Sequence, residues 1–105
     1  MSIFTITKEK EGCYDMEGDL VFLTINNKTI RALDFIKSEK EVNISLEKIK
    51  LADSAGLALI IECIKYSKLN DTNLSFRHVP EQLLTLAELG GFDMSPYLSD
   101  TPNIY

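Results

Sequence analysis

The residues of this sequence that could do chemistry gather in one short segment, Asp-Ser-Ala-Gly at positions 53–56, which runs directly into apolar residues at helical spacing. Asp53 and Ser54 are both good N-cap residues, because their side-chain oxygens can accept a hydrogen bond from an amide of the first helical turn. Either residue could be the cap. Ala55 and Gly56 leave this turn with almost no side-chain bulk, so another molecule can approach it closely. The segment predicts a helix start that presents a serine.

Three kinds of chemistry suit a serine in this position. The simplest is an ordinary helix cap. A phosphate on Ser54 would lie at the positive end of the helix dipole, and a protein partner could dock against the bare turn and bond the hydroxyl. We therefore consider Ser54 as a possible phosphorylation site and as a partner-binding residue.

A catalytic serine is a fourth possibility, because positions 52–56 approximate the strand-to-helix elbow of hydrolases. The partners available in chain order would be Asp71 and His78, the only histidine. His78 lies in a predicted strand, where a structural histidine is the simpler interpretation. A chain of this length also lacks room for a hydrolase sheet. We expect no enzyme activity and no catalytic residue.

Length and composition limit the remaining functions. The 105 residues suit a single domain over residues 1–105, with a core over about 3–92 and a tail at 93–105. Sixteen acidic and eleven basic residues give a net charge of -5, without a dense Lys/Arg cluster, so nucleic-acid binding is not expected. The longest apolar run, Leu57 to Ile61, is far below the roughly 20 residues of a membrane span, and the N-terminus does not resemble a signal peptide. We expect a cytoplasmic protein without direct membrane insertion.

The two cysteines, Cys13 and Cys63, do not have the spacing of a metal site. Buried or idle thiols are the simpler interpretation. No Gly-rich phosphate loop with a following lysine occurs, so we do not expect the chain to bind ATP by itself in that manner. We expect neither a metal nor a cofactor.

The hydrophobic periodicity predicts how these residues are positioned. Strands are expected where apolar and polar residues alternate, and helices where apolar residues recur every three or four positions. The predicted strands are 3–7 and 13–17, joined as a hairpin, then 41–46 and 73–79. The predicted helices are 20–37, 55–69 and 80–89. The order predicts a single α/β domain with a mixed four- to five-stranded sheet, an N-terminal hairpin and three main helices packed on it.

The helix at 55–69 has an apolar arc that is wider than one sheet face requires. Its sheet-facing stripe is expected to be Leu57, Ile60, Ile61 and Ile64. The wide arc predicts either a helix wedged between the sheet and its neighbours or an outer surface that meets a partner around Ala55, Ala58, Leu59 and Glu62.

The chain resembles the STAS domain family over most of its length. The family is marked by an Asp-Ser/Thr-small-Gly-Leu turn between its third strand and the following helix, as at positions 53–57, and Met16 to Leu20 resembles the end of its earlier strand. In one branch, the anti-sigma-factor antagonists, the serine that matches Ser54 is phosphorylated by a partner kinase. In another branch, the MlaB-like subunits of the Mla phospholipid-transport system of Gram-negative bacteria, the STAS domain binds the ATPase of an ABC transporter.

The sequence is more similar to the second branch, on the residues 18–24, 53–62 and 79–87. The resemblance implies a non-catalytic subunit that binds and stabilises or regulates an MlaF-like ABC ATPase. It would lie on the inner membrane through that ATPase and its permease, and serve phospholipid transport between the membranes. The alternative is an anti-sigma factor antagonist switched by phosphorylation of Ser54, with an anti-sigma factor or serine kinase as partner. The residues expected at the partner contact are Asp53, Ser54, Ala55, Gly56, Ala58, Leu59 and Glu62.

Overall fold

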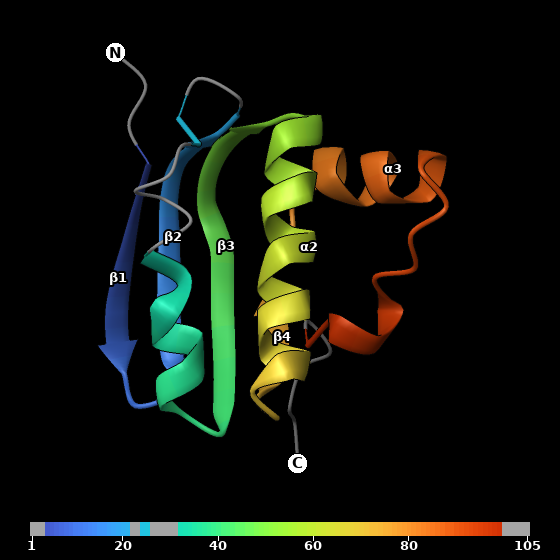
Figure 1. Cartoon of the computed structure of the whole chain (residues 1–105). Helices are drawn as coiled ribbons and strands as arrows, with labels where there is room; N and C mark the ends of the chain where they lie inside the picture. The colour runs from blue at the N-terminus through green and yellow to red at the C-terminus, as the bar shows by residue number, and fades with distance from the viewer. Residues whose placement is uncertain (1–3, 22–23, 26–31, 100–105) are drawn as a thin grey trace.

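A four-stranded mixed sheet forms the centre of the fold in the computed structural model, which describes residues 4–21, 24–25 and 32–99 (Figure 1). The strands are β1 (Phe4–Lys10), β2 (Cys13–Leu20), β3 (Glu41–Ala52) and β4 (Asn73–Arg77). They lie in the order β1-β2-β3-β4. The hairpin pair β1 and β2 is antiparallel, and β2, β3 and β4 are parallel to one another. The predicted N-terminal hairpin and mixed sheet are therefore confirmed.

The core lies between the sheet and the helices that cover one of its faces (Figure 1). Val42, Ile44 and Leu46 alternate along β3 and are all buried, as their spacing predicts. Ile44 pairs with Tyr14 of β2 on one side and Phe76 of β4 on the other, and all three side chains are buried. This row of apolar side chains crosses the sheet and forms the floor of the core.

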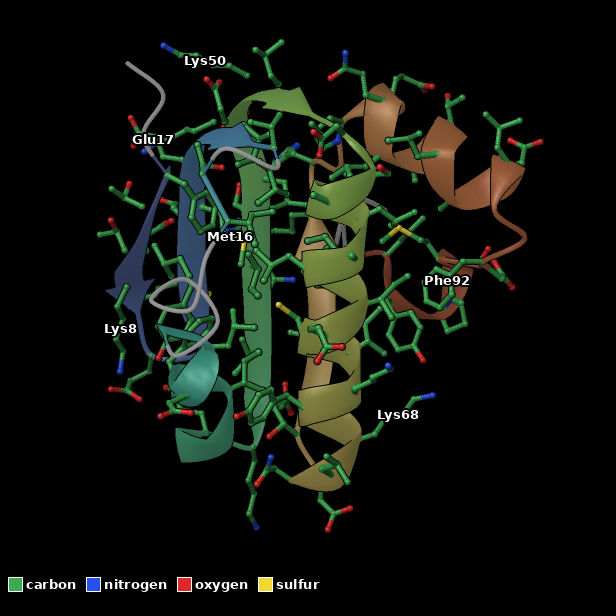
Figure 2. The ribbon with its side chains drawn as sticks, turned by 45° about the horizontal axis from the view of Figure 1, so that its top comes forward. Lys8, Met16, Glu17, Lys50, Lys68 and Phe92 are labelled. Carbon is green, nitrogen blue, oxygen red and sulfur yellow. The ribbon has the colours of Figure 1, made fainter. Side chains whose placement is uncertain are left out.

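The other face of the sheet is polar. Figure 2 shows Met16 of β2 directed into the core and its neighbour Glu17 pointing away from it. Lys48 of β3 pairs with Asp15 of β2 at 3.6 Å on this polar side. From Cys13 to Glu17, buried residues of β2 alternate with more exposed ones, as a strand with one covered face requires.

Helix α2 (Ser54–Leu69) runs along β3 and β4, and the 3₁₀ helix η1 (Ala32–Ser38) lies beside it on the same face (Figure 1). Helix α3 (Glu81–Leu89) crosses at the edge of the sheet, beside the first turns of α2. Pro80 is the N-cap residue of α3, whereas the predicted helix over 80–89 had it as the first helical residue. Among the described residues there are thus two α-helices and two 3₁₀ helices, η1 and the short η2 (Ser95–Tyr97), where three main helices were expected.

The helix predicted over 20–37 is wrong at its start. Leu20 closes β2 and pairs with Ala52 of β3. The strand predicted at 13–17 continues past Gly18, because the φ of +110° at this glycine takes up a register shift beside Asp19, after which pairing with β3 resumes. Residues 22–23 and 26–31 of that predicted helix lie outside the described residues.

The segment after α3 belongs to the core more than its composition predicted. Met94 is buried, and Leu98 forms a bridge with Phe76 of β4 in the parallel sense. The amide of Ser99 donates to the carbonyl oxygen of Phe76 at 2.9 Å. The core therefore extends beyond residue 92, and the segment after α3 adds a short fourth pairing at the β4 edge of the sheet.

Candidate functional site

Asp53 is the N-cap of α2, which decides between the two caps that the sequence allowed. Its Oδ1 accepts hydrogen bonds from the amides of Ala55 at 2.9 Å and Gly56 at 3.2 Å. Ser54 is consequently the first residue of the helix and is exposed. Its hydroxyl is not used for capping, so it can bond a group from another molecule.

Gly56 is buried beneath the first turn of α2 and is not part of the exposed surface of the site. A Cβ at this position would overlap the carbonyl oxygen of Leu20 and lie 3.0 Å from the Leu20 Cγ. The same carbonyl accepts a hydrogen bond from the amide of Asp53 at 3.2 Å. The glycine therefore lets the first turn of α2 sit directly on the end of β2, and the expectation that a partner approaches the backbone at Gly56 is wrong.

An open groove of about 610 Å³ adjoins Ser54. Ala52, Asp53 and Ser54 line one side of it. The other side comes from α3 and consists of Glu81, Gln82, Thr85 and Leu86. Sequence reasoning missed the contribution of α3, because nothing in the spacing of its residues indicates which face meets the start of α2.

One hydrogen bond links the first turn of α3 to the end of β3. The amide of Ala52 donates to Oε1 of Gln82 at 3.2 Å. It gives the last strand residue a partner and places the first turn of α3 beside Ser54. The groove is therefore built from two helix starts that meet at the carboxyl end of β3.

The outer surface of α2 continues from Ser54 along the helix. Ala58 and Glu62 are exposed, as expected, and Ala55 is half-buried. Glu62 pairs with Lys65 one turn later at 3.5 Å between its Oε1 and the lysine Nζ. Ser54, Ala58, Glu62 and Lys65 thus form one exposed stripe, which we call the α2 stripe.

The placement of Leu59 on the outer surface is wrong. Leu59 is only 2% exposed and belongs to the core with Ile60 and Cys63. Helix α2 contacts η1, α3, β3 and β4, so its buried arc is wider than a single sheet face would make it. Of the predicted sheet-facing stripe, Ile60 and Ile64 are buried, whereas Leu57 and Ile61 are half-buried. The wide apolar arc is mostly explained by this wedged position.

A second polar cluster lies at the other end of the sheet. Glu39, just before β3, accepts hydrogen bonds from the Tyr14 hydroxyl at 2.6 Å and the Gly12 amide at 2.9 Å. The bond from Tyr14 is the main reason that the pKa of Glu39 is lowered to about 2, and the amide of Gly12 and the charge of Lys8 lower it further. These bonds hold the hairpin of β1 and β2 against the start of β3. Ser54 follows the other end of β3, so the cluster takes no part in the groove.

The chain-order partners of a catalytic serine do not assemble. Asp71 precedes β4 and His78 follows it, each with a φ of +54°. A strand of five residues spans roughly 16 Å at about 3.3 Å per residue, so these two side chains start from opposite ends of β4. Asp71 is therefore not placed to orient His78 as the hydrolase alternative would require.

Cys63 does not have the surroundings of a reactive thiol. Cys13 and Cys63 are free thiols, and burial raises the pKa of Cys63 to about 12. Over residues 4–21, 24–25 and 32–99, no three His, Cys, Asp or Glu side chains gather as a metal would need. Within the same residues, no helix is long and apolar enough to cross a membrane.

Comparison with known proteins identifies what this arrangement is similar to. A family model described as the STAS domain matches residues 5–103. Among solved structures, the chain is similar to the anti-sigma factor antagonist SpoIIAA in its unphosphorylated form, with 11% identity and a TM-score of 0.61, over 95% of this chain and 89% of that one. The phosphorylated form of SpoIIAA, a Bacillus cell fate determinant, gives the same identity and TM-score over 95% of this chain and 92% of that one. At this identity the likeness shows the fold alone. No curated protein matches the sequence.

Proposed function

Because this chain belongs to the STAS domain family, we propose that it is a non-catalytic subunit that binds a partner protein through Ser54, the α2 stripe and the adjoining groove. The partner that we propose is the ATPase subunit of an ABC transporter that moves phospholipids, an MlaF-like protein. Through this ATPase and its permease the subunit would lie on the cytoplasmic side of the inner membrane. Its role would be to stabilise or regulate the ATPase.

The observation that carries this proposal is that Asp53 caps α2 and leaves the neighbouring Ser54 exposed. Asp53 supplies the cap, so the hydroxyl of Ser54 is exposed at the rim of the groove and available for an intermolecular hydrogen bond. A serine without a base beside it is a poor nucleophile but a good short-range donor at a docking surface. The resemblance of residues 18–24, 53–62 and 79–87 to MlaB-like subunits supplies the class of partner.

A second candidate is an anti-sigma factor antagonist, with an anti-sigma factor or serine kinase as partner. It is favoured by the similarity to SpoIIAA in both its unphosphorylated and phosphorylated forms. A phosphate on Ser54 would add about -1.5 to -2 charges. At the rim of the groove it would stand near Glu81 and Asp53, where its added charge and bulk would disrupt a contact made with the unmodified serine.

The two candidate functions predict different partner proteins in a pull-down. The experiment is an affinity pull-down from the native organism with the full chain as bait, followed by mass spectrometry, with Ser54→Arg as the interface variant. Thr5→Arg is the matched control, because Thr5 is an exposed hydroxyl residue on the polar face of the sheet. We expect ABC transporter subunits with wild type and Thr5→Arg and their loss with Ser54→Arg.

Other outcomes of the pull-down decide against the proposal. Recovery of a serine kinase or anti-sigma factor without any ABC subunit would favour the second candidate. Recovery of ABC subunits with all three baits would keep the partner but remove Ser54 from the contact. Purified partner then gives a quantitative test, since a protein that binds only the folded ATPase raises its melting temperature by mass action.

A further inference from the structure

We infer that strand β4 is a pairing surface for a second copy of this chain, and that the segment of residues 94–99, which we call the C-terminal strap, keeps this surface covered. The strap follows α3 and returns to the edge of the sheet at β4, where η2 and Leu98 meet the strand (Figure 1). Detachment of the strap would leave the backbone of β4 available to another strand. Neither Ser54 nor its groove takes part, so this surface is independent of the proposed function.

The strap bonds the backbone of β4 at one residue. The amide of Ser99 donates to the carbonyl oxygen of Phe76 at 2.9 Å, and the Ser99 hydroxyl donates to the same oxygen at 3.1 Å. The bridge from Leu98 also reaches Phe76. Backbone groups of successive strand residues point to opposite edges, so those of Leu74 face the same edge as those of Phe76. A strand paired along the whole of β4 would therefore bond Leu74 as well as Phe76.

The strap is held lightly against the rest of the fold. Met94 is its buried anchor, while the residues that follow it, up to Ser99, are half-buried or exposed. An open hollow of about 410 Å³ lies between the strap and α3, with Met94 and Leu98 on one side and Leu84 on the other. A segment with few buried contacts can detach without unfolding of the core.

Asn43 of β3 fastens the end of the strap, but its own hydrogen bonds are incomplete. Its Nδ2 donates to the Ser99 Oγ at 2.7 Å and to the Ser75 Oγ at 2.8 Å. Its Oδ1 is buried and has no hydrogen-bond partner among the described residues. A buried acceptor without a donor costs free energy, and detachment of Ser99 would expose it to water. This relief lowers the cost of opening the strap.

The two edges of the sheet are protected in different ways. Strand β1 carries Lys8, Glu9 and Lys10, and its register with β2 shifts between Lys8 and Lys10. Charged residues and irregular register are what keep an edge strand from pairing with another chain. Strand β4 has a single charge, Arg77 at its end, and an unbroken register with β3. The strap therefore supplies the protection that the sequence of β4 lacks.

Strand β4 is complementary to itself in the antiparallel sense. A two-fold axis through Ser75 places Leu74 opposite Phe76 of the other copy, in a pair that can exchange two backbone hydrogen bonds. The same axis places Asn73 opposite Arg77, so no like charges meet. Leu74 and Phe76 are 5% and 0% exposed on the core side, and their pairing would join the apolar layers of the two copies. A second copy therefore satisfies both the backbone and the side chains of this edge.

The test is sedimentation velocity of the full chain over a concentration series, with Ser99→Pro as the variant that detaches the strap. Proline removes both the amide and the hydroxyl that bond Phe76. We expect a monomer for wild type and a reversible dimer for Ser99→Pro. Asn43→Ala, which frees the Ser99 hydroxyl from β3, should give the same dimer and serves as the second variant if Ser99→Pro does not fold by circular dichroism.

A matched pair of changes at Asn73 tests the register of this dimer. In the detached background, Asn73→Arg would place an arginine opposite Arg77 of the other copy, whereas Asn73→Glu would place a carboxylate there. Asn73 is exposed, and its neighbour Glu41 on β3 meets either side chain equally in monomer and dimer. Because the axis repeats each pair twice, Asn73→Arg should raise the dissociation constant roughly twofold to thirtyfold and Asn73→Glu should lower it by a similar factor.

Hydrogen exchange of the wild-type chain tests the opening by itself. The amide of Phe76 faces the strap and should exchange faster than that of Ser75, which points toward β3. Equal protection of the two amides would mean that the strap opens only when the core unfolds, and would overturn the inference. A folded, strap-detached variant that stays monomeric would also overturn it, as would a dimer that responds in the same direction to Asn73→Arg and Asn73→Glu.

Discussion

Gly56 lies directly against the carbonyl oxygen of Leu20, so that no side chain fits between the first turn of α2 and the end of β2. This contact sets the depth at which α2 begins. The Leu20 carbonyl also accepts the amide of Asp53, the cap of the same helix. The position of Ser54 at the rim of the groove therefore depends on a glycine two residues later.

Gly56→Ala should destabilise the domain in spite of the better helix propensity of alanine. Alanine would gain about 1 kcal/mol from propensity, whereas forcing the Cβ against the Leu20 carbonyl should cost at least the 1–3 kcal/mol typical of overpacking. The measurement is urea unfolding followed by circular dichroism. Gly90→Ala is the matched control, because Gly90 has a φ of -85° and a Cβ there would lie 3.4 Å from its nearest atom. Equal stabilities for the two variants would show that the contact with Leu20 relaxes freely.

Asp53→Ala should cost about 1 kcal/mol of unfolding free energy, because two amides of the first turn lose their acceptor. Ser54→Ala should change stability by less than about 0.5 kcal/mol, as expected for an exposed residue that is not the cap. Thermal or urea unfolding of both variants measures the difference. A larger loss for Ser54→Ala than for Asp53→Ala would mean that the serine caps the helix after all.

Neighbouring residues on α2 should respond in opposite ways. Ala58→Glu should leave the domain folded with nearly the wild-type melting temperature, because Ala58 is exposed on the α2 stripe. Leu59→Ala should cost about 2–5 kcal/mol, the usual range for truncating a buried leucine. If Ala58→Glu melted as early as Leu59→Ala, the assignment of the two faces would be wrong.

Glu39 should control the acid limb of the stability curve. Its pKa is about 2 in the folded chain against an ordinary value of 4.5, so its contribution to stability is complete above pH 4.5 and is lost as the pH falls from there toward 2. Glu39→Gln should therefore be less stable near neutral pH, and its stability should fall less steeply between pH 4.5 and 2. Urea midpoints across this range measure the slope. A Glu39→Gln slope equal to wild type would remove the bonds from Tyr14 and Gly12 as the cause.

Residues whose roles follow from local chemistry could be predicted from the sequence. The alternation at Val42, Ile44 and Leu46 predicted a strand with one buried face, because a strand has a period of two whatever it packs against. The Asp-Ser pair predicted the start of α2 within one residue, because capping uses only neighbouring amides. The STAS resemblance, carried by the same turn, predicted the family and the α/β fold.

The tertiary structure alone decided what depends on distant segments. Leu59 and Ala58 are adjacent in a wide apolar arc, and only the packing of η1 and α3 against α2 decides which of them is covered. Gly18 lies at a register shift within β2 and not at its end, because Asp19 and Leu20 still pair with residues of β3. The groove beside Ser54 required α3, more than 25 residues later in the chain, which buries Leu83 and Ala87 in the core and accepts the amide of Ala52 through Gln82. Periodicity and capping are properties of a few consecutive residues, whereas burial and the shape of a groove are properties of which elements meet, and no local pattern encodes that meeting.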